Sequence, residues 1–234
     1  MLTVLIALGA NLLIAIAKTI AAALTGAASM VAEAAHSWAD TGNEIFLYVA
    51  ARRSVKPDDA SHPVGYGREA YVWSLFAAFG LFVVGAGFSI MHGVQELFDP
   101  EPADRFGISY AVLAIAFVLE GTSFLQAWRQ SRREASASHR DVLDHVMSTS
   151  DPTLRAVFFE DAAALIGLVI AFVGILLHQI TGSALPDAFG SILVGLLLAV
   201  VAYVLIRQNR RFLIGVAVEP DVRAAALQRL LAPS

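Results

Sequence analysis

Long apolar runs follow one another along the chain, with short polar connections between them. An α-helix that crosses the hydrocarbon core of a bilayer needs about 20 mostly apolar residues. Six runs of this kind are present, at residues 2–24, 29–51, 70–97, 107–128, 155–180 and 186–207. The period-2 alternation of membrane-spanning strands is not sustained along the sequence. The pattern therefore predicts an all-α polytopic membrane protein with six transmembrane helices.

The composition is that of a membrane protein rather than a soluble domain. Of the 234 residues, 57% are hydrophobic and 15% are charged, with a mean hydropathy of +0.67, whereas a soluble domain has about 25% charged residues. The absence of cysteine excludes disulfides, thiolate metal sites and thiol catalysis. The run at 2–24 lacks a preceding basic segment and is too long for the apolar part of a signal peptide, so we interpret it as a membrane helix.

The basic residues are sorted between the connections. They are Arg52, Arg53, Lys56 and Arg68 after the second run, Arg129, Arg132, Arg133, Arg140 and Arg155 around the fourth connection, and Arg207, Arg210 and Arg211 after the last run. The positive-inside rule then places both termini and both basic loops in the cytoplasm. We expect a six-helix transmembrane domain over residues 1–212 and a short cytoplasmic stub over 213–234, in which 220–231 forms an amphipathic helix.

The second run carries polar and ionisable side chains on one helical face. At 3.6 residues per turn, Glu33, His36, Asp40 and the pair Asn43 and Glu44 fall along one stripe. His36 and Asp40 are one turn apart, so an imidazole nitrogen and a carboxylate oxygen can reach one divalent cation, as in zinc sites. The alternative is a set of polar contacts with a neighbouring helix. Because several costly groups share one face, we favour a hydrated functional site.

The fifth run supplies the other candidate ligands. Glu160 and Asp161 lie two turns beyond the Asp151–Pro152 helix start, which is too deep for a helix-dipole interaction alone to explain them. Combined with His36 and Asp40, they would form a metal site with excess negative charge. Protons would compete with the metal at such a site, because its ligands bind metal only when deprotonated.

Polar residues in the other runs stand alone. We expect Lys18 in the first run to extend its ammonium group towards the membrane interface. Glu120 in the fourth run is interpreted as an interhelical contact.

Four motifs become recognisable when the runs are considered together. They are "HSWAD" in the second run, "HPVGYGREAYVWSL" after the first basic loop, "FFEDAAALIG" in the fifth run and "LPDAFGSILVGLLLA" in the sixth. Together they resemble the cation diffusion facilitator family of zinc transporters over residues 2–215. The chain looks closest to a branch with a Glu-Asp pair on the fifth span, which includes a mitochondrial zinc exporter.

The resemblance implies a homodimeric secondary transporter in a lipid bilayer. It would exchange cytoplasmic divalent metal, above all Zn²⁺, for protons by alternating access, with the metal as substrate and no cofactor. We expect no enzyme activity and no nucleic-acid partner, and a location in the inner or plasma membrane of the cell. The family's cytoplasmic C-terminal α/β domain is expected to be absent or truncated.

The resemblance also implies a tetrahedral transport site, with two ligands one turn apart on the second span and two on the fifth. His36 and Asp40 match the first pair, and Asp161 matches the fifth-span aspartate. The remaining position falls on Val157, which cannot bind metal. Glu160 is the substitute that we favour, although it lies about 100° around the helix from Asp161.

Four further residues are weaker candidates for metal ligands. Asn43 is a second choice for the missing position in the transport site. Some members of the family bind zinc in the loop after the second span, and here Asp58, Asp59 and His62 remain, with Tyr66 where a second histidine is expected. The alternative is a loop whose residues only shape the turn into the third span.

Two other interpretations of the whole chain stay open at this point. Val157 motivates a non-transporting partner subunit that pairs with an active homologue. An intramembrane metalloenzyme would need a multi-histidine array or an H-E-x-x-H motif, and only His36 is buried at the depth of the site. No phosphate-binding glycine loop is present, which disfavours an ATP-driven pump.

Overall fold

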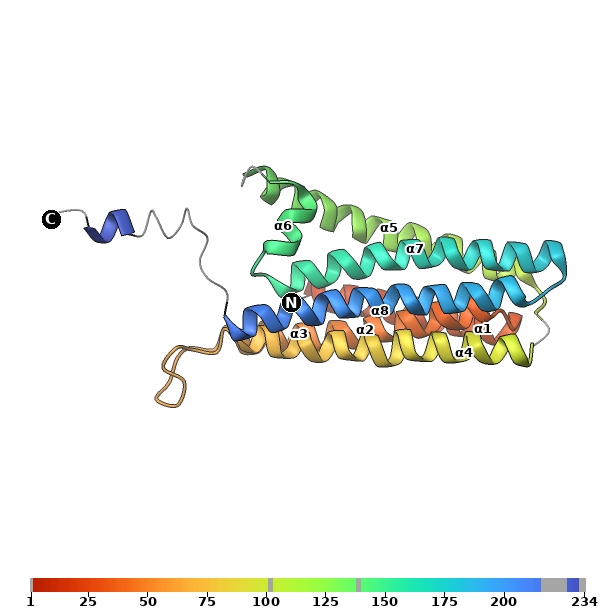
Figure 1. Ribbon diagram of the computed structural model, residues 1–234, viewed down its shortest axis with the longest axis horizontal. Coiled ribbons are helices and arrows are strands. Elements are labelled where there is room, and N and C mark those ends of the chain that lie inside the picture. Colours follow the sequence, from red (N-terminus) through yellow and green to blue (C-terminus); the bar gives the residue numbers. More distant parts are fainter. Residues whose placement is uncertain (1, 101–102, 138–139, 216–226, 232–234) are drawn as a thin grey trace.

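The computed structural model describes residues 2–100, 103–137, 140–215 and 227–231 as a bundle of long helices (Figure 1). The elements are α1 (Leu2–Thr25), α2 (Ala28–Ser54), α3 (Glu69–Gly80), η1 (Leu81–Gly87), α4 (Phe88–Phe98), α5 (Phe106–Ala137), α6 (Val142–Ser148), α7 (Pro152–Thr181) and α8 (Leu185–Ile214). Within the described ranges there is no strand, only an isolated bridge between Asp59 and His62. The prediction of an all-α polytopic membrane protein is confirmed.

Among the described residues, five helical segments are long and apolar enough to cross a membrane. They are Leu8–Thr25, Glu69–Phe98, Phe106–Ala137, Pro152–Thr181 and Leu185–Ile214. The second of these joins α3 to α4 through η1, a π-type turn. The remaining predicted span, α2, has 27 residues, which gives it a length of about 40 Å at 1.5 Å per residue. Because α2 carries the polar stripe, it is not among these five apolar segments.

Helix ends differ most from the prediction around the fourth connection. α5 continues to Ala137 instead of ending at 128, and this connection contains α6, which was not predicted. α5 extends because Arg, Gln and Glu favour a helix almost as strongly as Leu does, so the end of an apolar run does not end the helix. Of the amphipathic helix predicted at 220–231, residues 227–231 are helical, and the preceding residues lie outside the described part.

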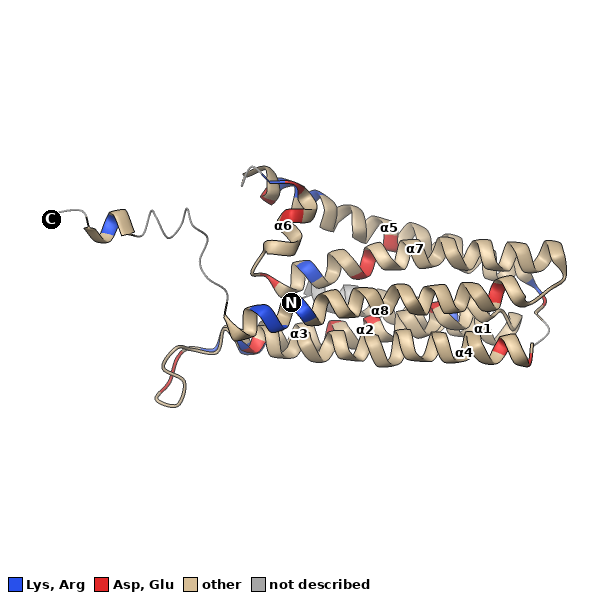
Figure 2. Ribbon diagram, viewed as in Figure 1, with Lys and Arg blue, Asp and Glu red and all other residues tan. Residues whose placement is uncertain are grey.

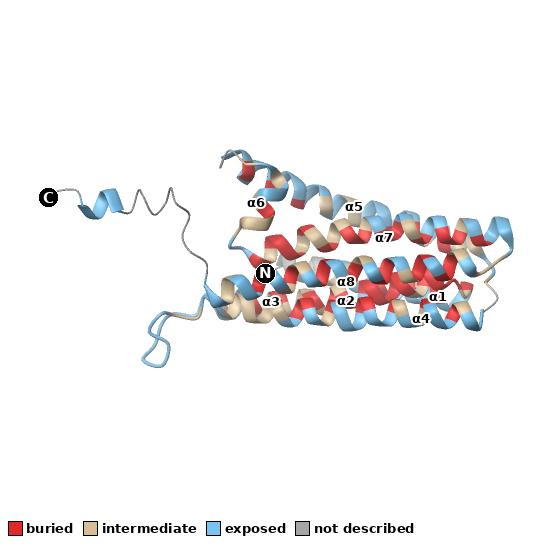
Figure 3. Ribbon diagram, viewed as in Figure 1, coloured by how far each residue is buried: buried red, intermediate tan, exposed pale blue. Residues whose placement is uncertain are grey.

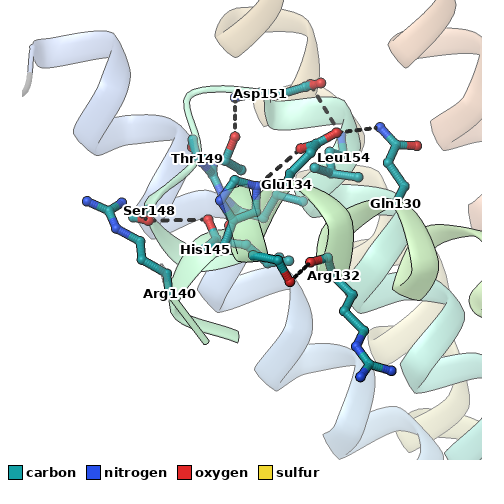
Figure 4. Close-up of polar contacts among 12 residues, drawn as sticks. Gln130, Arg132, Glu134, Arg140, His145, Ser148, Thr149, Asp151 and Leu154 are labelled. Atoms are coloured by element: carbon teal, nitrogen blue, oxygen red, sulfur yellow. Dashed lines mark hydrogen bonds and ion pairs between the residues drawn. The ribbon is translucent and has the colours of Figure 1, made fainter. Parts of the chain in front are cut away.

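Polar contacts position α6 between α5 and α7 (Figure 4). The Nε2 atom of His145 in α6 lies 3.1 Å from Oε2 of Glu134 in α5. At the start of α7, Asp151 Oδ1 accepts hydrogen bonds from the backbone N–H groups of Thr153 at 2.8 Å and Leu154 at 3.2 Å. The Asp-Pro helix start predicted from the sequence is therefore confirmed, since Asp at the N-cap and Pro at the first position both favour initiation.

α2 is the central helix of the bundle. It contacts α1, α3, α4, α7 and α8, whereas α5 packs against α1, α6 and α7 at the periphery. Figure 3 shows buried residues on the inner helix faces and a largely exposed α5. The exposed side chains of α5 include large apolar ones such as Ile115 and Val118, as expected for a lipid-facing surface. The polar stripe of α2 is thus enclosed by protein.

The start of α2 is capped by a different helix. Ala27 stands at the N-cap position and provides no side-chain acceptor. Instead, the carboxylate of Asp187 in α8 accepts from the N–H groups of Ala28 at 2.7 Å and Ser29 at 3.1 Å. Asp187 therefore satisfies the free N–H groups of α2 as an N-cap residue would, and it joins α2 to α8.

Positively charged residues gather mainly at one end of the bundle. Figure 2 shows most Lys and Arg at the end that holds α6 and the loop between α2 and α3. α1 begins and α8 ends at this same end (Figure 1). This arrangement is the one that an even number of antiparallel spans produces.

Candidate functional site

α2 places His36 and Asp40 inside the bundle, one turn apart as predicted. The His36 side chain is fully buried, and its Nδ1 atom lies 3.5 Å from Oδ1 of Asp40, whose side chain is 18% exposed. Neither ring nitrogen of His36 has a hydrogen-bond partner in the described structure, nor does Asp40 Oδ1. A buried polar atom without a partner costs about 1–3 kcal/mol and is uncommon. Lone pairs of an imidazole and a carboxylate are thus available side by side.

Glu160 and Asp161 of α7 turn towards different neighbours. Asn43 of α2 donates a hydrogen bond to Glu160 Oε2, while Glu160 Oε1 and Asn43 Oδ1 are buried without a partner. Ser123 of α5 donates to Asp161 Oδ2 at 2.7 Å. Since consecutive helical residues point about 100° apart, one carboxylate reaches α2 and the other reaches α5. Asn43 therefore orients Glu160 and keeps its own carbonyl oxygen free.

A cavity of about 420 Å³ brings these elements together. Asp40, Glu160 and Asp161 all line it, so three of the four predicted ligands share one space. His36 is not among the lining residues. Val157, the position at which the resemblance implies a fourth ligand, also lines the cavity. Its side chain is apolar, and Glu160 is the additional acid that α7 brings to the same space.

The predicted ligands are close to one cavity, yet they do not converge on one point. Within the described part of the chain, no three His, Asp or Glu side chains stand close enough together to hold one metal ion. The hydrogen bonds from Asn43 and Ser123 draw Glu160 and Asp161 towards opposite sides. Metal binding would therefore require these two carboxylates to turn towards each other.

Acidic and basic residues outside the predicted ligand set also belong to this region. Glu44 and Glu120 line the cavity, and Asn11 of α1 donates to Glu44 Oε1 at 2.6 Å. Lys18 lies 2.9 Å from both Glu120 and Glu33. The prediction that Lys18 extends to the interface is wrong, because two carboxylates hold its ammonium group in the interior. The sequence does contain a signal for this pairing, because one lysine and two glutamates lie within the predicted membrane runs. Ionisable side chains in such a position have to be paired.

The loop after α2 brings Asp59 and His62 together as a turn. Asp59 Oδ1 accepts hydrogen bonds from Ser61 Oγ at 2.5 Å and from the N–H of His62 at 2.9 Å, and Oδ2 accepts from the Tyr66 hydroxyl at 2.7 Å. These bonds, first that from Ser61, hold the pKa of Asp59 well below its usual range. Asp58 takes no part in this network. Because the oxygens of Asp59 are already engaged, the contacts support the interpretation as a shaped loop.

Comparison with known proteins gives one family and several relatives. A model of the cation efflux transmembrane domain matches residues 4–214. The chain is 38% identical over 218 residues to the mitochondrial proton-coupled zinc antiporter SLC30A9 of Mus musculus, and 37% identical over 201 residues to metal tolerance protein C4 of Arabidopsis thaliana. The cation-efflux pump FieF of Shewanella oneidensis is 28% identical over 158 residues.

These alignments cover the chain more fully than they cover the relatives. They include 93%, 86% and 67% of this chain, in the order given, but 38%, 44% and 50% of the three relatives. The chain thus spans half or less of the length of each of them.

Proposed function

This chain belongs to the cation efflux family, and from that premise we propose that it is a secondary active transporter of divalent metal cations. Zn²⁺ is the substrate we favour, moved out of the cytoplasm in exchange for protons by alternating access. The observation that carries the proposal is the cavity inside the helical bundle that Asp40, Glu160 and Asp161 all line. The family is one of transporters, so the chain is not an enzyme, and the intramembrane metalloenzyme is set aside.

In the proposed metal-bound state, α2 supplies His36 and Asp40, and α7 supplies Asp161 and Glu160. One imidazole nitrogen and three carboxylate oxygens form a ligand set that zinc accepts in tetrahedral geometry. The unpaired nitrogens of His36 and the unpaired Oε1 of Glu160 support this assignment. Asn43 is the alternative fourth ligand, because its free carbonyl oxygen could bind metal while its amide group still orients Glu160.

Proton coupling would follow from competition for the same lone pairs. Carboxylates and imidazole bind a metal only when they are deprotonated, so metal entry releases protons and protonation expels the metal. Buried carboxylates without a counter-charge are costly. The cavity is therefore expected to hold either a metal ion or protons in each half of the transport cycle.

The proposal extends to topology and assembly. α2 is proposed to cross the membrane as well, which makes six spans in total. Residues 1–212 would form the transmembrane domain and 213–234 a cytoplasmic segment, with both termini in the cytoplasm. A homodimer in the inner or plasma membrane is the assembly and location that we favour. The mouse relative is mitochondrial by name, and mitochondria are therefore the alternative location to test. Recovery of the protein from mitochondria in cell fractionation would contradict the proposed location.

A second, weaker metal position is proposed in the loop after α2. Asp58, Asp59 and His62 would supply its ligands. A metal ion there would have to displace the hydrogen bonds that Asp59 now accepts from Ser61 and Tyr66. Titration of the purified protein with Zn²⁺, compared with His62→Ala, would show whether the loop binds at all.

The transport proposal is tested by zinc flux in proteoliposomes under a pH gradient that can be reversed. Zinc is expected to move opposite to protons, to change direction with the gradient, and to stop in Asp161→Ala. Asp104→Ala is the matched control, since this aspartate lies outside the bundle with its side chain 73% exposed, and it should transport like the wild type.

Each other outcome of this experiment has a definite meaning. Zinc movement that ignores the gradient would contradict proton coupling. The absence of flux for every divalent cation would contradict transport and favour the non-transporting partner subunit, which the side chain of Val157 in the cavity suggests.

A further inference from the structure

A second group of buried charges lies beside the cavity, and we call it the Lys18 centre. It consists of Lys18 of α1, Glu33 of α2 and Glu120 of α5. The ammonium nitrogen lies 2.9 Å from Glu33 Oε2 and 2.9 Å from Glu120 Oε1. The side chains of Lys18 and Glu33 are fully buried, and that of Glu120 is 12% exposed. Three helices, α1, α2 and α5, thus meet at one cation.

The centre has more negative than positive charge. Two carboxylates and one ammonium group leave a formal charge of −1 when all three are ionised. The second oxygen of Glu33, Oε1, is buried and has no hydrogen-bond partner in the described structure. It faces Gly167 of α7, where a Cβ atom would stand 2.6 Å from it. Any side chain at position 167 would therefore displace this oxygen, and the glycine allows the Glu33 carboxylate to stay ionisable and unpaired on this side.

We propose that Glu33 and Glu120 form a second cation-binding position, which the ammonium group of Lys18 occupies as a tethered substitute for a divalent ion. Two carboxylates from different helices, converging on one positive charge, are the arrangement that binds a hard cation through oxygen. Such oxygen ligands suit Mn²⁺ or Mg²⁺ better than a soft metal. The position differs from the transport site in its residues and in its permanent occupant.

The consequence for transport rests on the proposed function. Glu120 lines the same cavity as Asp40 and Asp161, so without Lys18 it could compete with them for the transported metal. With the ammonium group fixed at 2.9 Å, Glu120 already has a positively charged partner. Lys18 therefore restricts the exchangeable metal to the ligands of α2 and α7.

The test counts Mn²⁺ ions bound by the full chain in detergent, from the loss of the electron paramagnetic resonance signal of free Mn²⁺. All variants carry Asp40→Asn, which weakens the proposed transport site. Lys18→Met is expected to bind one more Mn²⁺ per chain than the matched control Lys18→Arg, which retains the cation. Lys18→Met combined with Glu33→Gln restores the net charge of the centre and should lose the additional ion.

The outcomes separate this inference from the proposed function. A folded Lys18→Met that binds no more Mn²⁺ than Lys18→Arg overturns the inference. If Lys18→Met fails to fold with and without Mn²⁺, the inference is overturned as well, whether or not the charge-restored variant folds, because a free ion then cannot replace the ammonium group. Failure of the proposed function would appear instead as absent zinc flux in the wild type, and it leaves the difference between the Lys18 variants unchanged.

Discussion

The cavity and the Lys18 centre contain the same type of side chain in one helical bundle, but with different neighbours. In the Lys18 centre, Glu33 and Glu120 lie 2.9 Å from an ammonium group. In the cavity, Asp40 lies beside an imidazole and Glu160 beside an amide, and both acids retain oxygens without partners. A fixed positive charge makes a buried carboxylate part of the scaffold, whereas a carboxylate beside an imidazole or an amide keeps an oxygen free, which is what the proposed exchange of metal ions requires.

Asp187 shows a third way to accommodate a buried carboxylate. Its oxygens accept hydrogen bonds from backbone N–H groups at the start of α2, where the positive end of the helix dipole also lies. Changes at these three places should therefore have different effects. A change in the cavity should affect transport, one in the Lys18 centre should affect stability through the charge balance, and one at Asp187 should affect helix capping.

The largest expected effect is on transport and comes from the cavity. Asp40→Ala should lower zinc flux in proteoliposomes by roughly 100-fold or more, since even supporting residues of metal sites contribute 10–100-fold. Its folding should be preserved, because the variant removes a buried charge that lacks a charged partner. Size-exclusion chromatography checks the fold. Ser123→Ala, which removes only the hydrogen bond to Asp161, should lose less, and wild-type flux in Asp40→Ala would refute the assignment.

The next effect is on stability and comes from the Lys18 centre. In the presence of chelator, Lys18→Met should lower the free energy of unfolding by about 3–5 kcal/mol, as expected when one partner of a buried ion pair is removed. Thermal unfolding in detergent measures the change, with Lys18→Arg as the charge-preserving control. Equal stability of Lys18→Met and the wild type would mean that the two glutamates do not need the ammonium group.

A smaller effect is expected at the cap of α2. Asp187→Ala leaves the N–H groups of Ala28 and Ser29 without their acceptor and should destabilise the protein by about 0.5–2 kcal/mol, the usual contribution of an N-cap. The same thermal unfolding assay applies. Asp187→Asn, which retains one acceptor oxygen, should lie between Ala and the wild type, and a loss as large as that in Lys18→Met would argue for a role beyond capping.

The smallest effect is expected in the loop after α2 when the pH is lowered. Hydrogen bonds to the charged form lower the pKa of Asp59, so its contribution is complete above the ordinary aspartate value of about 3.9 and is lost only below it. Between about pH 7 and about pH 5 the Asp59 carboxyl signal in NMR should therefore not titrate. Zinc binding in the cavity should weaken over the same interval, because protons compete there.

The central helix and its polar stripe could be predicted from the sequence because both are local. A spacing of four residues fixes two side chains one turn apart, and His36 and Asp40 do lie 3.5 Å apart at their nearest polar atoms. The family resemblance is likewise confirmed by the match over residues 4–214. The assignment of the metal ligands themselves remains a prediction.

The partners of Lys18 could not be predicted in the same way. Glu33 and Glu120 are 15 and 102 residues away in sequence, and their approach depends on how α1 packs against α2 and α5. The apolar run at 107–128 also does not predict that α5 continues to Ala137, because the polar residues after 128 favour a helix as well. Apolar runs indicate which residues lie in the membrane. They do not show how a helix is rotated, which helices it contacts, or where it ends outside the membrane.

The π-type turn at Leu81–Gly87 bears on how this chain is aligned with its relatives. A turn closed by i→i+5 bonds holds one more residue than an α-helical turn, and one residue rotates everything after it by about 100°. An alignment with a relative that lacks the turn needs a one-residue gap within 81–87. Without this gap, each position of α4 would be matched to a residue on the wrong side of the helix, and lipid-facing and protein-facing substitutions would be confused.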